Sequence, residues 1–205
     1  MTYLEIVEAC EKDFLEHGDT YLGAGWTKSE QQALDRYEVV LSLTDEDSDF
    51  SLLDFGCGTA RLLDYALSRR RSSMDYSGLD LSHQVLDVAR AKHPECAFWQ
   101  LDVLEDDSEL PQFDYVIMNG VFQWKGTMSE EDMLDYAARL LKTMWAHAKR
   151  GLAFNAMSTH VDWRRDELFY LPIETATDLV ARHMSRRFRV LHDYGLHEYT
   201  VHVHV

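Results

Sequence analysis

Leu52-Leu53-Asp54-Phe55-Gly56-Cys57-Gly58-Thr59-Ala60-Arg61 combines a short apolar run, an acidic residue and two closely spaced glycines. This order predicts a buried strand followed by a tight turn that opens a helix. Glycine in such a turn lets the backbone approach a ligand closely. A dinucleotide site would have a third glycine where Arg61 stands. Asp54 also places a negative charge beside the turn, which suits a ligand with a cationic amino-acid part better than a diphosphate.

Two further strands are predicted to end in an aspartate. Tyr76–Leu79 precedes Asp80, and Ala97–Leu101 precedes Asp102. Doubly wound sheets bind ligands at the carboxyl ends of their parallel strands, so these acids and Asp54 should share one edge. Carboxylates there can accept hydrogen bonds from ribose hydroxyls and an adenine amine. The pattern favours a nucleoside-type ligand, although three aspartates that merely begin turns are the alternative.

The remainder of the chain predicts a doubly wound α/β fold with a seven-stranded sheet and helices on both faces. Four more strands are expected at Phe113–Met118, Gly151–Asn155, Phe188–His192 and Glu198–Val205. Only residues 193–197 separate the last two. A parallel crossover needs a dozen or more residues, so the last strand should run antiparallel in an otherwise mostly parallel sheet.

Residues 1–49 are expected to form an N-terminal helical extension or lid, and residues 50–205 the main domain. Apolar residues recur at helical spacing from Leu4 to Phe14, and Ser29 with Gln32 forms a capping-box pattern for a second helix. The glycine-containing loop of residues 18–28 between them is expected to close over the ligand.

Composition excludes several partners. The 205 residues carry a formal charge of −16, which disfavours nucleic acid and anionic membrane surfaces. The N-terminus lacks the pattern of a signal peptide, and no apolar run is long enough to span a membrane. Three cysteines without a close pair, Cys10, Cys57 and Cys96, suit reduced thiols in a cytoplasmic protein. The sequence leaves open whether the chain forms a homodimer.

The series Asp54-x-Gly56-x-Gly58, Asp80 and Asp102-Val103, followed by Phe113–Met118, resembles class I S-adenosylmethionine (SAM) methyltransferases. The resemblance covers about residues 50–205 and implies a Rossmann-like methyltransferase domain. It implies that the glycines line the methionine part of SAM, that Asp80 holds the ribose, and that Asp102 and Val103 meet the adenine. Asn119 would begin the loop beside the transferred methyl. The expected SAM-binding set is Trp26, Arg36, Asp54, Gly56, Cys57, Gly58, Asp80, Leu81, Asp102, Val103 and Asn119, with Arg36 pairing with the SAM carboxylate.

The sequence departs from the family pattern at two points. Ala60 stands where the family often has a third glycine. No Asn/Asp-Pro-Pro-Tyr motif follows the fourth predicted strand, which disfavours amino-group methylation of bases or glutamine. Three segments, Gly25-Trp26, Arg36–Val40 and Leu191–Val201, resemble small bacterial methyltransferases linked to surface-glycan or secondary-metabolite pathways.

The expected reaction is methyl transfer to a small molecule, with a hydroxyl oxygen of a sugar, metabolite or acid preferred as the acceptor atom. His192 is the preferred general base, although a structural histidine at a strand end is the alternative. The expected acceptor-binding residues are Phe122, Trp124, His160 and Tyr170. A small-molecule N-methyltransferase, a non-catalytic SAM-binding subunit and an NAD-dependent oxidoreductase are the competing hypotheses.

No metal site is expected. His202 and His204 alternate on one face of the last strand, but zinc needs three or four ligands and no third ligand is evident. A solvent-facing histidine pair is the favoured interpretation.

Overall fold

The computed structural model describes residues 3–25, 29–44, 48–69 and 74–205. Its centre is a seven-stranded sheet with the order β3-β2-β1-β4-β5-β7-β6, in which only β7 opposes its neighbours. This confirms the predicted doubly wound sheet with a reversed last strand. The strands are β1 (Phe50–Phe55), β2 (Met74–Leu79), β3 (Ala97–Trp99), β4 (Phe113–Met118), β5 (Ala148–Met157), β6 (Arg187–Leu191) and β7 (Glu198–His204).

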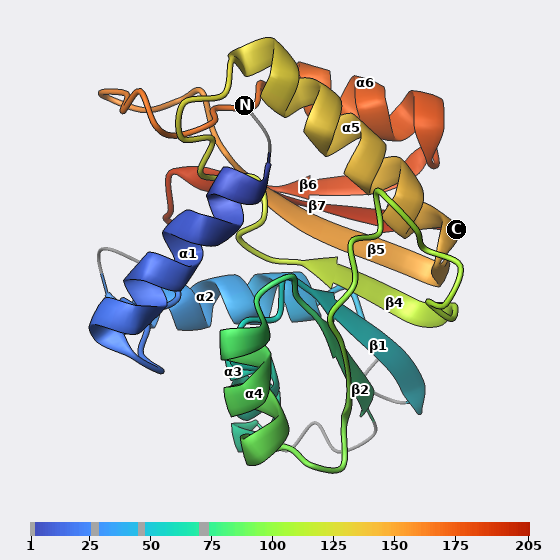
Figure 1. Ribbon diagram of the computed structural model, residues 1–205. Helices are drawn as coiled ribbons and strands as arrows, with labels where there is room; N and C mark the ends of the chain where they lie inside the picture. The colour runs from blue at the N-terminus through green and yellow to red at the C-terminus, as the bar shows by residue number, and fades with distance from the viewer. Residues whose placement is uncertain (1–2, 26–28, 45–47, 70–73) are drawn as a thin grey trace.

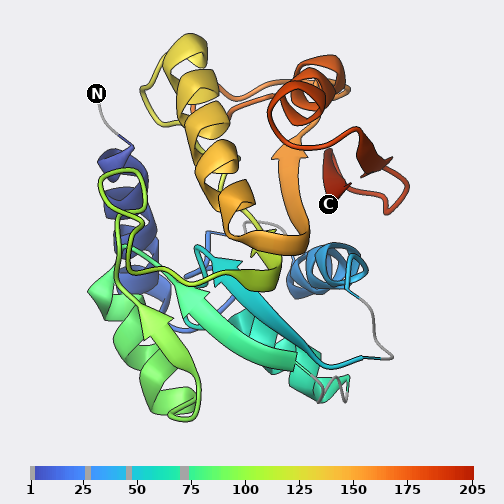
Figure 2. The same cartoon turned by 90° about the vertical axis from the view of Figure 1, so that its right-hand side faces the viewer.

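Helices cover both faces of the sheet (Figures 1 and 2). One face packs on α2 (Glu30–Leu41), α3 (Arg61–Ser68) and α4 (His83–Lys92). The other packs on α5 (Glu130–Ala146) and α6 (Ile173–His183). The side chain of Ser29 accepts the amide hydrogen of Gln32, so the predicted cap starts α2. Ser129 accepts that of Asp132 in the same way and caps α5. None of these helices is long and apolar enough to cross a membrane, a finding limited to the residues above.

The two N-terminal helices differ in how they pack. α2 buries Tyr37, Val40 and Leu41 in the same core as β1. α1 (Leu4–His17) has no fully buried residue, and Figure 1 shows it at the side of the molecule. It ends at Gly18, whose φ of 64° suits glycine. α1 is therefore the loosely packed part of the N-terminal segment.

β7 departs from the expected half-exposed pattern. Six of its seven residues are buried, because β7 lies between β5 and β6 and is covered on both faces. The prediction that His202 and His204 face solvent is wrong for His202, which is fully buried and hydrogen bonded through Nε2 to the Val39 carbonyl at 2.9 Å. Burial lowers the pKa of His202 to about 4, so this imidazole is neutral near pH 7.

Candidate functional site

The glycine turn after β1 has the backbone that its sequence predicts. Gly56 and Gly58 have φ angles of 73° and 54°, in the left-handed region that favours glycine. Ala60 shares this conformation with a φ of 62° and is the only described non-glycine residue with a positive φ. A Cβ on Gly56 would lie 3.3 Å from Val121. The turn is therefore both conformationally demanding and closely approached by the loop after β4.

Asp54 lies at the end of β1 and is 3% exposed. The hydroxyl of Tyr76 on β2 donates to its Oδ2 at 2.8 Å. Burial nevertheless raises the pKa of Asp54 to about 7, because one hydrogen bond does not replace the water that a carboxylate loses. A cation placed beside Asp54 would favour its charged form, which is the behaviour expected of a group that binds an ammonium.

Asp80 is held in place by the backbone on both sides of it. The amides of Gly58 and Ser82 donate to its two carboxylate oxygens at 2.9 and 3.0 Å. Burial raises the pKa of Asp80, and these amide bonds oppose the shift. The carboxylate thus ties the glycine turn to the start of α4 and has a fixed orientation at the sheet edge.

A cavity of about 210 Å³ lies over these residues, and we call it the first cavity. Its lining includes Asp54, Asp80, Leu81, Asn119 and the glycine turn of residues 56–58. α1 closes it from above with Ile6, Val7 and Cys10. Most of the predicted SAM-binding residues therefore meet around one cavity under the N-terminal helix.

Asp102 and Val103 are placed differently from the rest of the predicted set. Val103 is buried in the core, and Asp102 accepts a hydrogen bond of 2.6 Å from the hydroxyl of Tyr3. The Tyr3 ring stacks on Tyr136 of α5 at 5.1 Å, and Tyr136 lines the first cavity. A tyrosine hydroxyl of the chain itself thus donates to the acid that was expected to meet adenine.

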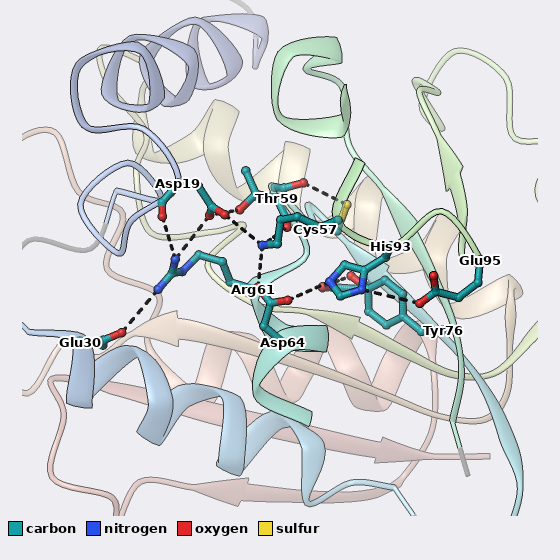
Figure 3. Close-up of polar contacts among 12 residues, drawn as sticks. Asp19, Glu30, Cys57, Thr59, Arg61, Asp64, Tyr76, His93 and Glu95 are labelled. Carbon is teal, nitrogen blue, oxygen red and sulfur yellow. Dashed lines mark hydrogen bonds and ion pairs between the residues drawn. The ribbon is translucent and has the colours of Figure 1, made fainter. Parts of the chain in front are cut away.

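A polar cluster holds Asp19, just after the end of α1, against the start of α3 and the end of α4 (Figure 3). Asp19 accepts from the Thr59 hydroxyl at 2.6 Å and from Lys92 Nζ at 3.0 Å, and its backbone oxygen accepts from Arg61 at 3.1 Å. Lys92 also bonds Asp64 at 2.6 Å. Thr59 and Arg61 both line the first cavity, so this cluster attaches the segment directly to the site.

A second cavity of about 530 Å³ adjoins the first, and the two share Cys10, Ala24 and Gly120 in their walls. Its lining includes Trp124 and Tyr170, two of the four predicted acceptor-binding residues. The loops after β4 and β5 form one wall, since the Phe169 amide donates to the Gln123 carbonyl and the Lys125 amide to the Glu167 carbonyl, both at 2.9 Å.

Two predicted acceptor residues lie elsewhere. Phe122 is fully buried and packs edge-on against Phe154 in the core. His160 is exposed on the surface loop after β5. Neither side chain lines the first or the second cavity among the described residues, so the structure does not bring them to the predicted site.

Arg36 lines the second cavity, and it forms a buried ion pair with Glu198 at the start of β7. Gln123 donates to the other oxygen of Glu198 at 2.6 Å. The predicted pairing of Arg36 with the SAM carboxylate thus meets a competing partner within the chain. Glu198 itself was missed, because nothing in an alternating strand marks one acidic residue as a buried cavity wall.

His192 lies just beyond β6 and is exposed. Its ring is 6.3 Å from that of His160 and 6.2 Å from that of Tyr199, and it lines neither described cavity. Its predicted role as general base therefore gains no support from its position. Trp26 lies outside the described residues. Within them, no group of three potential metal ligands occurs.

Comparisons with known proteins agree with this geometry. Residues 53–151 match the model of a methyltransferase domain family. A Mycobacterium tuberculosis (strain ATCC 25618 / H37Rv) protein named methyltransferase Rv1506c is 31% identical over 154 residues, which cover 74% of this chain and 91% of that protein.

Solved structures show the same fold. Magnesium protoporphyrin IX methyltransferase from Synechocystis PCC 6803 with bound SAM has a TM-score of 0.66 at 14% identity, covering 100% of this chain and 97% of that one. The plantazolicin methyltransferase BpumL in complex with S-adenosylhomocysteine (SAH) has a TM-score of 0.63 at 14% identity, with coverage of 98% and 96%.

Proposed function

Because the chain belongs to the class I SAM-dependent methyltransferases, we propose that it methylates a small molecule bound in the second cavity, at a hydroxyl oxygen. The observation that carries this proposal is the shared wall of the two cavities, formed by Cys10, Ala24 and Gly120. The two cavities adjoin at these residues, so a group in the second cavity can approach the first there. A cavity of about 530 Å³ suits a small molecule rather than a polymer.

The residues around the first cavity fit SAM. Asp54 would hold the ammonium group, Asp80 the ribose hydroxyls, and the glycine turn would admit the methionine part without a side chain in the way. Bound SAM supplies a methyl group already activated by its sulfonium. The residues of the chain then have to align the acceptor and exclude water, which are the main contributions expected for such a transfer.

Loop and helix contacts supply that alignment. Asn155 on β5 accepts from the Gly120 amide at 2.7 Å and donates to Asn119 at 3.1 Å, which fixes the loop between the two cavities. α1 and residues 18–25 would act as a lid, since they cover the first cavity and few of their residues are buried. A proton from a hydroxyl acceptor would have Glu198 and His197 as neighbouring groups in the second cavity.

The test has two parts. Calorimetry with SAM and SAH measures binding, and transfer of labelled methyl from SAM to a panel of sugars, phenols and hydroxy acids measures turnover. We expect SAH binding together with labelling of a hydroxyl compound. If only amines added to the panel are labelled, the competing hypothesis of a small-molecule N-methyltransferase is favoured. Binding without any labelled product would favour the non-catalytic subunit, and absence of binding would refute the proposal.

Matched variants of the second cavity sharpen this test. Trp124→Ala removes an aromatic wall of the second cavity and should raise KM for the acceptor, with the Kd for SAH unchanged. Trp145→Ala on α5 is the control for losing an indole elsewhere. Equal effects of both variants on acceptor KM would argue against the second cavity as the acceptor site.

A further inference from the structure

The described wall of the second cavity contains more acidic than basic side chains. Among the residues that the structure describes, its lining has four acidic residues, Asp13, Asp162, Glu167 and Glu198, and two arginines, Arg36 and Arg165. Each arginine is already paired with a carboxylate of the same wall: Arg165 Nε donates to Glu167 at 2.6 Å, and Arg36 pairs with Glu198. The described part of the wall therefore carries net negative charge, and the whole chain has a formal charge of −16.

Glu198 is the acidic residue that reaches furthest inside. It is 1% exposed, whereas Asp13 and Asp162 are exposed at the rim. A carboxylate has about four acceptor positions. Contacts with Arg36 and Gln123 use two of them. The remaining capacity can take one more donor, and a buried carboxylate gains from every donor that it receives.

Gln123 places Glu198 relative to the first cavity. It donates to Glu198 and lies on the same loop as Asn119 and Gly120, which line the first cavity and are hydrogen bonded to Asn155. A group hydrogen bonded to Glu198 is thus held near the boundary of the two cavities, where a methyl group would be transferred under the proposed function.

We propose that the second cavity selects an uncharged or positively charged acceptor that donates a hydrogen bond to Glu198, and that it rejects acids. This inference rests on the proposed function, and it narrows the sugars, metabolites and acids expected from sequence to non-acidic compounds. An anion placed here would lie beside a desolvated carboxylate, with both arginines already engaged in ion pairs. Breaking either pair to receive it would leave a carboxylate without its counterion.

Three probes with one shared ring test the inference. Tyramine, tyrosol and 4-hydroxyphenylacetate all carry a 4-hydroxyphenyl group, and their side chains are cationic, neutral and anionic. Binding to the SAH-loaded protein is measured by calorimetry at physiological salt. We expect tyramine and tyrosol to bind at least about 10-fold more tightly than the acid, a difference of about 1.4 kcal/mol.

Variants then test whether Glu198 causes this difference in affinity between the probes. Glu198→Gln should reduce the difference between tyramine and the acid to about 3-fold or less, because the buried negative charge is gone. If Glu198→Gln unfolds because Arg36 loses its partner, the double variant with Arg36→Gln removes both charges. Asp178→Asn on the exposed face of α6 makes the same charge change outside the cavity and should leave the order intact.

The outcomes separate this inference from the proposed function. Equal or tighter binding of the acid, or no binding of any probe to the SAH-loaded protein, overturns the assigned acceptor class. If Glu198→Gln and the double variant keep the parent's difference in affinity between tyramine and the acid, the role of Glu198 is overturned. Failure to bind SAH overturns the proposed function instead.

Discussion

Asp54→Asn is expected to stabilise the free protein while weakening SAM binding. Burial raises the pKa of Asp54 from its ordinary value of 3.8 to about 7. Between these values the folded protein binds more protons than the unfolded chain, so the contribution of Asp54 to stability falls as pH rises and is lost above pH 7. Above pH 7 this shift corresponds to a destabilisation of the folded parent by about 4 kcal/mol. The neutral amide of Asp54→Asn removes this destabilisation, but its imperfect hydrogen bonding should cost about 1 to 2 kcal/mol.

The measurement is urea unfolding at pH 5 and pH 8, with and without SAH. At pH 8 and without ligand, Asp54→Asn should unfold with a free energy about 2 to 3 kcal/mol higher than the parent. SAH at 100 times the parent Kd should stabilise the parent by about 2.7 kcal/mol. An affinity about 30-fold lower, as expected for a lost charge-assisted hydrogen bond, would leave the variant a gain of only about 0.9 kcal/mol.

Asp114→Asn is the matched control in the neighbouring strand β4. Asp114 accepts hydrogen bonds from the amide and hydroxyl of Ser51 at 2.9 and 3.0 Å, and these contacts lower its pKa. Its stabilisation is lost as pH falls, so the substitution should destabilise the protein at pH 8 without changing SAH affinity. The reasoning is refuted if Asp54→Asn is no more stable than the parent at pH 8, or if it keeps the parent's response to SAH.

Tyr3→Phe should bind SAH about 3 to 10 times more tightly in calorimetry, because adenine would no longer compete with a phenol hydroxyl for Asp102; equal or weaker affinity would show that they do not compete. Burial lowers the pKa of His202 to about 4, so its contribution to stability is lost as pH falls from about 6.5 to 4, and His202→Gln should reduce the acid sensitivity of urea unfolding over that range. Asp19→Ala should lower the free energy of unfolding by about 1 to 2 kcal/mol and speed limited proteolysis within residues 3–25, since it removes the bonds to Thr59 and Lys92. An unchanged cleavage rate would show that α1 is held by other contacts.

Local sequence signals were sufficient for the sheet and most of the first cavity. The acids at the ends of β1 and β2 meet because parallel strands end at one edge, a consequence of topology that needs no side-chain detail. The short connection of residues 193–197 likewise determined the reversal of β7. These features follow from the order of residues along the chain and from general rules for sheets.

Features that depend on contacts between distant segments were not predictable in this way. Tyr3 and Asp102 are 99 residues apart, and their hydrogen bond exists only because α1 folds back over the sheet edge. The same limitation produced the error at His202, where the alternating pattern of the strand suggested that one face is exposed to solvent. The packing of α2 on that face could not be inferred from the strand itself.

The interior position of β7 has a consequence for the order of assembly during synthesis. β6 precedes β7 in the chain, yet its hydrogen-bonding partner in the sheet is β7, whose other edge pairs with β5. Until residues 198–204 emerge from the ribosome, β5 presents an open edge and β6 has nothing to pair with. Nascent chains stalled before that point should therefore be prone to intermolecular strand pairing, and release of the last strand should end this hazard.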